Sequence, residues 1–165
     1  MTDVAALLLR LWLGTVMVAH GRNHLRSRTG TARWFGSVGF RWPRIQAALS
    51  GAGEVAIGTS LILGLLTNLG TAGLIAIMTV AFWSIHRFAG FFVFARPDEG
   101  YEYVVTLVAA ATAVSILGPG RVSLDVVVFG GGLDGWAGAA TAAAGLLLGA
   151  LQLLVSWRRP PDSGD

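Results

Sequence analysis

Residues 46–66 read QAALSGAGEVAIGTSLILGLL, an apolar stretch in which Glu54 is the one charged side chain. A helix that crosses a lipid bilayer needs about 20 mostly apolar residues, and this stretch is long enough. Similar apolar segments cover residues 4–22, 69–89, 101–118 and 136–157. We therefore predict an all-α integral membrane bundle that forms a single domain. It has about five transmembrane helices and ends in a short polar tail at 158–165.

The overall composition supports a lipid environment. The chain has 165 residues, of which 54% are hydrophobic and 13% are charged, whereas soluble domains carry about 25% charged residues. Every basic side chain except histidine is an arginine, and most lie between the apolar segments. The positive-inside rule explains that placement, so we expect the lipid bilayer and no nucleic acid as a partner. The absence of cysteine excludes disulfides and any thiol redox chemistry of the chain's own.

The distribution of arginines also predicts an orientation. The connection between the first two spans contains Arg22, Arg26, Arg28, Arg33, Arg41 and Arg44. Arg96, Arg158 and Arg159 fall on the same side of a five-span bundle, whereas the opposite side has little more than Arg121. This bias places the N-terminus outside and the C-terminus in the cytoplasm.

Aromatic and small residues mark further features. The segment 31–40, TARWFGSVGF, is either a short interfacial helix with its aromatic side chains toward the acyl chains or an ordinary loop. Trp136 and Trp157 lie at the two ends of the last span, as interface anchors do. Within that span, small residues recur at four-residue spacing, at Ala137, Thr141, Gly145 and Gly149. The spacing suits close packing within the bundle or self-association into a homo-oligomer, and packing is the default reading.

Ionisable side chains inside spans are costly and tend to face the bundle interior. Glu54 shares a helix face with Ala47, Gly51 and Gly58, so it should point where another helix comes close. It is either a proton-handling or ligand-anchoring carboxyl or a structural hydrogen-bonding group. Arg10, inside the first span, is the candidate partner of Glu54; otherwise it extends toward the outer interface.

Three more titratable residues, His20, His86 and Glu102, should lie at one depth. They occur at the cytoplasmic ends of three different spans. Such a group could bind a polar head group and exchange protons, although each residue taken singly is more often an interface residue. His20 and His24 share a helix face, but two histidines without a third ligand are a weak metal signal, and we predict no metal site.

Several short stretches, read in order, carry a family resemblance. They are His20-Gly21, TARWFGSVGFRWP at 31–43, Glu54 in its glycine-rich span, His86, Gly100-Tyr101-Glu102-Tyr103 and GPGRVSLD at 118–125. Together they resemble the DoxX family of small bacterial membrane proteins. The family usually has a cation where His24 stands. Its members typically have four spans, so the last span here is an addition to a four-helix core.

The resemblance implies a multi-pass protein of the bacterial plasma membrane. Some relatives form the membrane subunit of a thiosulfate:quinone oxidoreductase. Others join a complex with a superoxide dismutase and a sulfurtransferase that is linked to oxidative and thiol stress, and more distant similarity reaches Surfeit-type cargo receptors. Many members have no known activity, so the family indicates the fold better than the function.

Two hypotheses follow. In the first, the chain is a redox-linked, quinone-coupled membrane subunit that needs a soluble or membrane redox partner. Glu54, His86 and Arg10 would hold the quinone, while His20, His86 and Glu102 would exchange protons with Glu54. In the second, the chain is a non-catalytic scaffold or receptor whose arginine-rich face and last helix recruit partner proteins.

Overall fold

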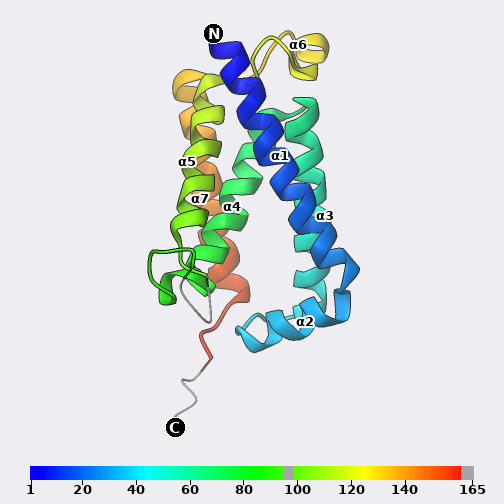
Figure 1. The fold of residues 1–165 in the computed structure, drawn as a ribbon, viewed down its shortest axis with the longest axis vertical. Helices are drawn as coiled ribbons and strands as arrows, with labels where there is room; N and C mark the ends of the chain where they lie inside the picture. The colour runs from blue at the N-terminus through cyan, green and yellow to red at the C-terminus, as the bar shows by residue number, and fades with distance from the viewer. Residues whose placement is uncertain (95–98, 161–165) are drawn as a thin grey trace.

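The computed structural model describes residues 1–94 and 99–160, and this part of the chain is helical throughout apart from its connections. The helices are α1 (Thr2–Arg26), α2 (Arg28–Ser37), α3 (Pro43–Leu63), α4 (Thr67–Ser84), the 3-10 helix η1 (His86–Phe88), α5 (Glu102–Leu117), α6 (Leu124–Phe129) and α7 (Gly135–Ser156). The long helices run up and down in one bundle (Figure 1), which confirms the predicted all-α membrane fold. Arg96 and the tail from Pro161 onward, both used in the predictions above, lie outside the described residues.

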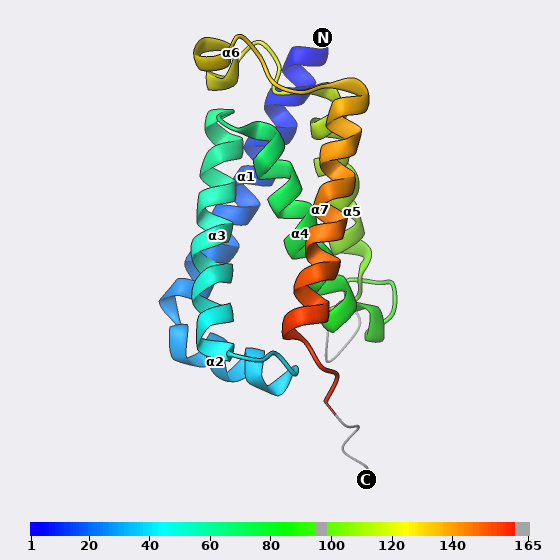
Figure 2. The same cartoon turned by 180° about the vertical axis from the view of Figure 1, so that it is seen from behind.

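Four helices of the described residues, α1, α3, α4 and α7, are long and apolar enough to cross a membrane. The chain is therefore a multi-pass membrane protein. Helix α5 has 16 residues and extends about 24 Å at 1.5 Å per residue, less than a hydrocarbon core of about 30 Å. It nevertheless runs beside α4 and α7 along the bundle (Figure 2). That α5 crosses the membrane fully stays a prediction. The orientation of the chain in the membrane depends on it and stays a prediction too.

Glycines set the close packing of α1 against α3. A Cβ atom at Gly58 would lie 2.6 Å from the carbonyl oxygen of Gly14, and one at Gly21 would lie 2.7 Å from that of Gly51. The two contacts are seven residues apart on each helix, so the antiparallel helices touch twice along one seam. Glu54 lies between Gly51 and Gly58 and is buried, as its helix face predicted.

The glycine face of α7 packs within the chain. A Cβ atom at Gly145 would lie 2.6 Å from the carbonyl oxygen of Ala72, and one at Gly149 would lie 2.7 Å from that of Ala76. Both contacts are with α4, so the small residues of α7 allow two helix backbones to approach within the bundle.

Helix α2 lies across one end of the bundle, near the C-terminal end of α7 (Figure 1). The structure thus contains the short helix rather than the ordinary loop. The orientation predicted for its aromatic residues is wrong at Phe35 and Phe40, because both are buried with Ala47 and Val80 instead of facing acyl chains. Only Trp34 remains exposed.

The chain that follows α2 is attached to the end of α7. Phe40 and Trp157 form an isolated antiparallel bridge. The backbone N–H of Arg41 donates to the carbonyl of Ser156 at 2.7 Å, and the Trp157 indole donates to the carbonyl of Val38 at 2.8 Å. Trp157 therefore joins two elements and is only partly exposed, whereas Trp136 is 92% exposed. We name the contact between residues 38–41 and 156–158 the α2–α7 clasp.

Candidate functional site

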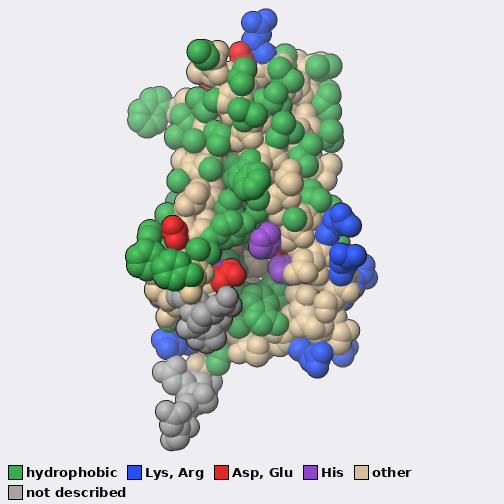
Figure 3. Space-filling model, in the orientation of Figure 1, with side chains coloured by type: hydrophobic (Ala, Val, Ile, Leu, Met, Phe, Trp, Pro, Cys, Tyr) green, Lys and Arg blue, Asp and Glu red, His purple; other side chains and the backbone are tan. Residues whose placement is uncertain are grey.

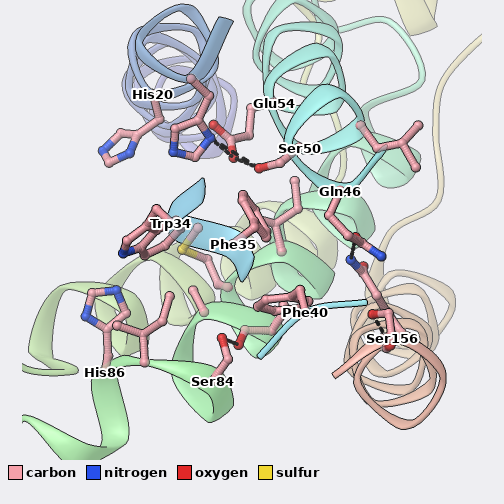
Figure 4. A pocket seen from close by; sticks show the side chains of 18 of the residues that line it. His20, Trp34, Phe35, Phe40, Gln46, Ser50, Glu54, Ser84, His86 and Ser156 are labelled. Atoms are coloured by element: carbon pink, nitrogen blue, oxygen red, sulfur yellow. Dashed lines mark hydrogen bonds and ion pairs between the residues drawn. The ribbon is translucent and has the colours of Figure 1, made fainter. Parts of the chain in front are cut away.

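A cavity of about 570 Å³ lies inside the α2 end of the bundle (Figure 4). Side chains of α1, α2, α3, α4 and α7 form its walls, together with residues near the start of α5. Aromatic and apolar groups such as Trp34, Phe35, Phe40 and Met78 alternate with a few polar ones. Volumes of about 300–1,000 Å³ with this mixture are typical of small-molecule sites.

Glu54 is the central polar group of the cavity. Its side chain is buried, and its Oε1 atom accepts a hydrogen bond from the Ser50 hydroxyl at 2.6 Å. The Nδ1 atom of His24 lies 3.3 Å from the same oxygen and 3.2 Å from the Ser50 hydroxyl. Ser50 precedes Glu54 by one helical turn, which places both side chains on the same face of α3. Figure 4 shows Glu54 and Ser50 together at one wall of the cavity.

The other carboxylate oxygen of Glu54 is unpaired. Oε2 is buried and has no hydrogen-bond partner in the described part of the chain. Leaving a buried polar atom unsatisfied costs about 1–3 kcal/mol, and more for a charged group. This oxygen therefore has unused hydrogen-bonding capacity, and it belongs to a residue that lines the cavity. It can accept a hydrogen bond from a ligand hydroxyl, or donate one to a ligand carbonyl when the carboxyl is protonated.

The predicted pairing of Arg10 with Glu54 is wrong. Arg10 donates to the carbonyl oxygens of Leu61 and Val122 and is completely buried, so it does not extend to the interface either. The glycine contacts explain this placement, because the antiparallel register brings Arg10 beside the last turn of α3. Leu61 lies seven residues beyond Glu54, or about 10 Å along the helix. Arg10 thus lies outside the cavity.

The remaining predicted site residues divide into two groups. His20 and His86 line the cavity. His20 stacks on Tyr103 with ring centroids 6.1 Å apart, and His86 Nδ1 lies 2.6 Å from the carbonyl oxygen of Glu99. Glu102 does not line the cavity, because its carboxylate accepts a hydrogen bond from the backbone N–H of Val93 at 3.3 Å. In the space-filling view, histidine side chains lie beside a hollow in this half of the bundle (Figure 3).

His20 and His24 engage different partners although they share a face of α1. His20 contacts Tyr103, whereas His24 contacts Ser50 and Glu54. Within residues 1–94 and 99–160, no group of three His, Cys, Asp or Glu side chains is arranged to hold a metal ion.

Sequence reasoning did not connect His24 with Glu54, and it missed two further candidates. It placed His24 outside the first span, but α1 continues to Arg26 and carries His24 to the cavity. It also missed Gln46 and Gln152, which line the cavity and are joined by a hydrogen bond of 3.1 Å between the two amides. A polar residue near the end of each of two apolar helices is a weak signal, and only the fold of the whole bundle brings these two amides together.

Comparison with known proteins gives one match. The model of the family described as DoxX matches residues 5–87. This range runs from the first turn of α1 to beyond the end of α4 and therefore includes His24, Ser50 and Glu54. Neither a curated protein nor a solved structure matches the chain.

Proposed function

The chain belongs to the DoxX family, and from that premise we propose that it is the membrane subunit of a redox-linked complex and binds a quinone in the cavity beside Glu54. One observation carries the proposal: Glu54, a buried carboxylate with one unpaired oxygen, is among the residues that line a largely apolar cavity of about 570 Å³. A lipid-soluble ligand with a polar head group suits such a site.

The chemistry of the lining supports a quinone among such ligands. Trp34, Phe35 and Phe40 offer aromatic surfaces against which a flat ring can pack. A protonated Glu54 donates a hydrogen bond to a carbonyl, and an ionised Glu54 accepts one from a hydroxyl, so the residue can bind either redox form. The amides of Gln46 and Gln152 provide a second polar contact in the same cavity.

The residues around Glu54 would manage protons. A bound quinone would take up two electrons and two protons, the electrons coming from a substrate oxidised by a partner protein. Glu54 would hold a proton at the ligand, and His24 and Ser50, which contact Oε1, would stabilise its two protonation states. His20 and His86, which lie farther along the lining, would exchange protons with the bundle end.

Native mass spectrometry of gently extracted protein tests this proposal. Wild type should retain a quinone, and Glu54→Gln should bind it about tenfold to a hundredfold more weakly, as expected for loss of a hydrogen bond to a charged group. Asp134→Asn is the matched control, since Asp134 is exposed and outside the cavity. The proposal is wrong if wild type retains no quinone, or if all three proteins retain it equally.

The second hypothesis, a scaffold or receptor, is favoured by a different observation. The arginines around α2 are exposed, and basic side chains gather at the lower right of Figure 3, over α2 and the adjoining helix ends. If this surface recruits a protein, Arg22→Gln with Arg26→Gln should release the partner in co-purification. Glu54→Gln should then leave the partner bound.

A further inference from the structure

A second cavity lies on the outer surface of the corner between α2 and α3, separate from the site around Glu54. Its volume is about 530 Å³. One side is formed by Arg28, Thr29, Ala32, Arg33 and Gly36 of α2, and the other by Pro43, Arg44, Ala47 and Ala48 of α3. The residues recur every three to four positions, so each helix presents one face to this groove. We call it the arginine groove.

The charged side chains that line the arginine groove are all positive. Arg28, Arg33 and Arg44 are exposed, and no ion pair joins any of them to an acidic side chain of the described residues. No aspartate or glutamate occurs anywhere between Asp3 and Glu54. The groove also adjoins the first turn of α3, where the helix dipole favours an anion. Three guanidinium groups without a carboxylate partner indicate that the groove binds an anion.

The surroundings of the groove distinguish a lipid from a free anion. The lining includes the buried methyl groups of Ala32 and Ala47. Next to Arg44 on α3, Ile45 is 58% exposed, and Ala48, which lines the groove, is exposed on the same membrane-spanning helix. A ligand whose phosphate lies at the arginines can therefore place acyl chains against these side chains.

We propose that the arginine groove binds the phosphate head group of an anionic phospholipid. Guanidinium groups suit a phosphate because their planar N–H donors match its oxygens. The bound lipid would contact α2 and α3 together and would hold α2 against the bundle, where Phe35 lines the first cavity. This proposal is independent of whether that cavity binds a quinone.

The test compares two triple variants of equal charge. Arg28→Gln, Arg33→Gln and Arg44→Gln remove the groove arginines, whereas Arg22→Gln, Arg26→Gln and Arg41→Gln remove three exposed arginines outside it. Each protein is reconstituted with phosphatidylglycerol or with phosphatidylcholine of the same acyl chains, and bound lipid is counted by native mass spectrometry. Melting in a neutral detergent checks that both variants fold.

The groove variant should lose phosphatidylglycerol binding by about tenfold to a hundredfold, while wild type and the second variant retain it and none of the proteins prefers phosphatidylcholine. Equal loss in both triple variants would overturn the proposal in favour of general surface charge. Retention by the groove variant would overturn it as well. A third arm uses inorganic phosphate alone: if phosphate binds wild type as tightly as the lipid does, the groove is a free-anion site and not a lipid site.

Discussion

Replacing Gly58 by alanine tests how closely α1 and α3 pack. A Cβ atom at this position would lie 2.6 Å from the carbonyl oxygen of Gly14 and 2.8 Å from the backbone nitrogen of Val18. Both are backbone atoms, so no change of rotamer can relieve the overlap. At Gly53 on the same helix, a Cβ atom would meet nothing within 4 Å. Gly53→Ala is therefore a matched control.

The two substitutions should change the free energy of unfolding in opposite directions. Alanine is more favourable than glycine in a helix interior by about 1 kcal/mol, so Gly53→Ala should raise the free energy of unfolding by up to that amount. At Gly58 the same gain is opposed by overpacking, which costs about 1–3 kcal/mol and lies at the upper end where backbone must move. We expect Gly58→Ala to be destabilised by about 1–2 kcal/mol, and to differ from Gly53→Ala by about 2–3 kcal/mol.

Reversible unfolding in mixed micelles with increasing sodium dodecyl sulfate measures this difference, with helix content followed by circular dichroism. Gly14→Ala should behave like Gly58→Ala, because a Cβ atom there would lie 2.6 Å from the carbonyl oxygen of Gly58. If Gly58→Ala is as stable as Gly53→Ala, the two helices do not meet at this seam. The register that separates Arg10 from Glu54 would then be refuted.

Two further predictions concern the two ends of the bundle. Asp125→Ala removes the acceptor of the backbone N–H groups of Leu66 and Thr67, at 2.6 and 2.9 Å, and should lower the free energy of unfolding by about 1–3 kcal/mol. Asp134→Ala, at an exposed position without a side-chain cap, should stay within about 0.5 kcal/mol, and equal effects of the two would contradict the capping role. Trp157→Phe removes the indole hydrogen bond to Val38 and should speed hydrogen exchange at the backbone N–H groups of Arg41 and Arg158, both of which belong to the α2–α7 clasp. Trp136→Phe is its exposed control, and unchanged exchange in Trp157→Phe would show that the indole does not hold the clasp.

The positions of the helices could be predicted because the thickness of a bilayer fixes the length of an apolar segment. The predicted segment 46–66 corresponds to α3 at Pro43–Leu63, and 136–157 corresponds to α7 at Gly135–Ser156. The burial of Glu54 was predictable for a second reason, since Gly51 and Gly58 on the same face mark where another helix approaches. The positions of the helices and the burial of Glu54 can therefore both be read from the residues within a single segment.

The partner of Glu54 could not be predicted because it depends on the register between α1 and α3. The sequence made Arg10, which lies inside the first span, the candidate partner of Glu54. In the structure the seam from Gly14–Gly58 to Gly21–Gly51 pairs Arg10 with Leu61 and brings His24 to Glu54. The end of α1 added to the error, since a helix that continues to Arg26 keeps His24 on the inner face. The register concerns packing between two segments and cannot be read from either segment alone.

Glu54 and Asp125, the two buried carboxylates among the described residues, differ in a way that bears on function. Asp125 uses both of its oxygens, one toward the N–H of Leu66 and the other toward that of Thr67, and it has the guanidinium of Arg10 nearby. Glu54 directs one oxygen to Ser50 and His24 and leaves the other unpaired at a cavity. A carboxylate that only stabilises a fold gains most when both oxygens are paired, because each unsatisfied buried atom costs about 1–3 kcal/mol. The arrangement at Asp125 is therefore structural, and the unpaired oxygen of Glu54 is the reason to look for a ligand at that end of the bundle.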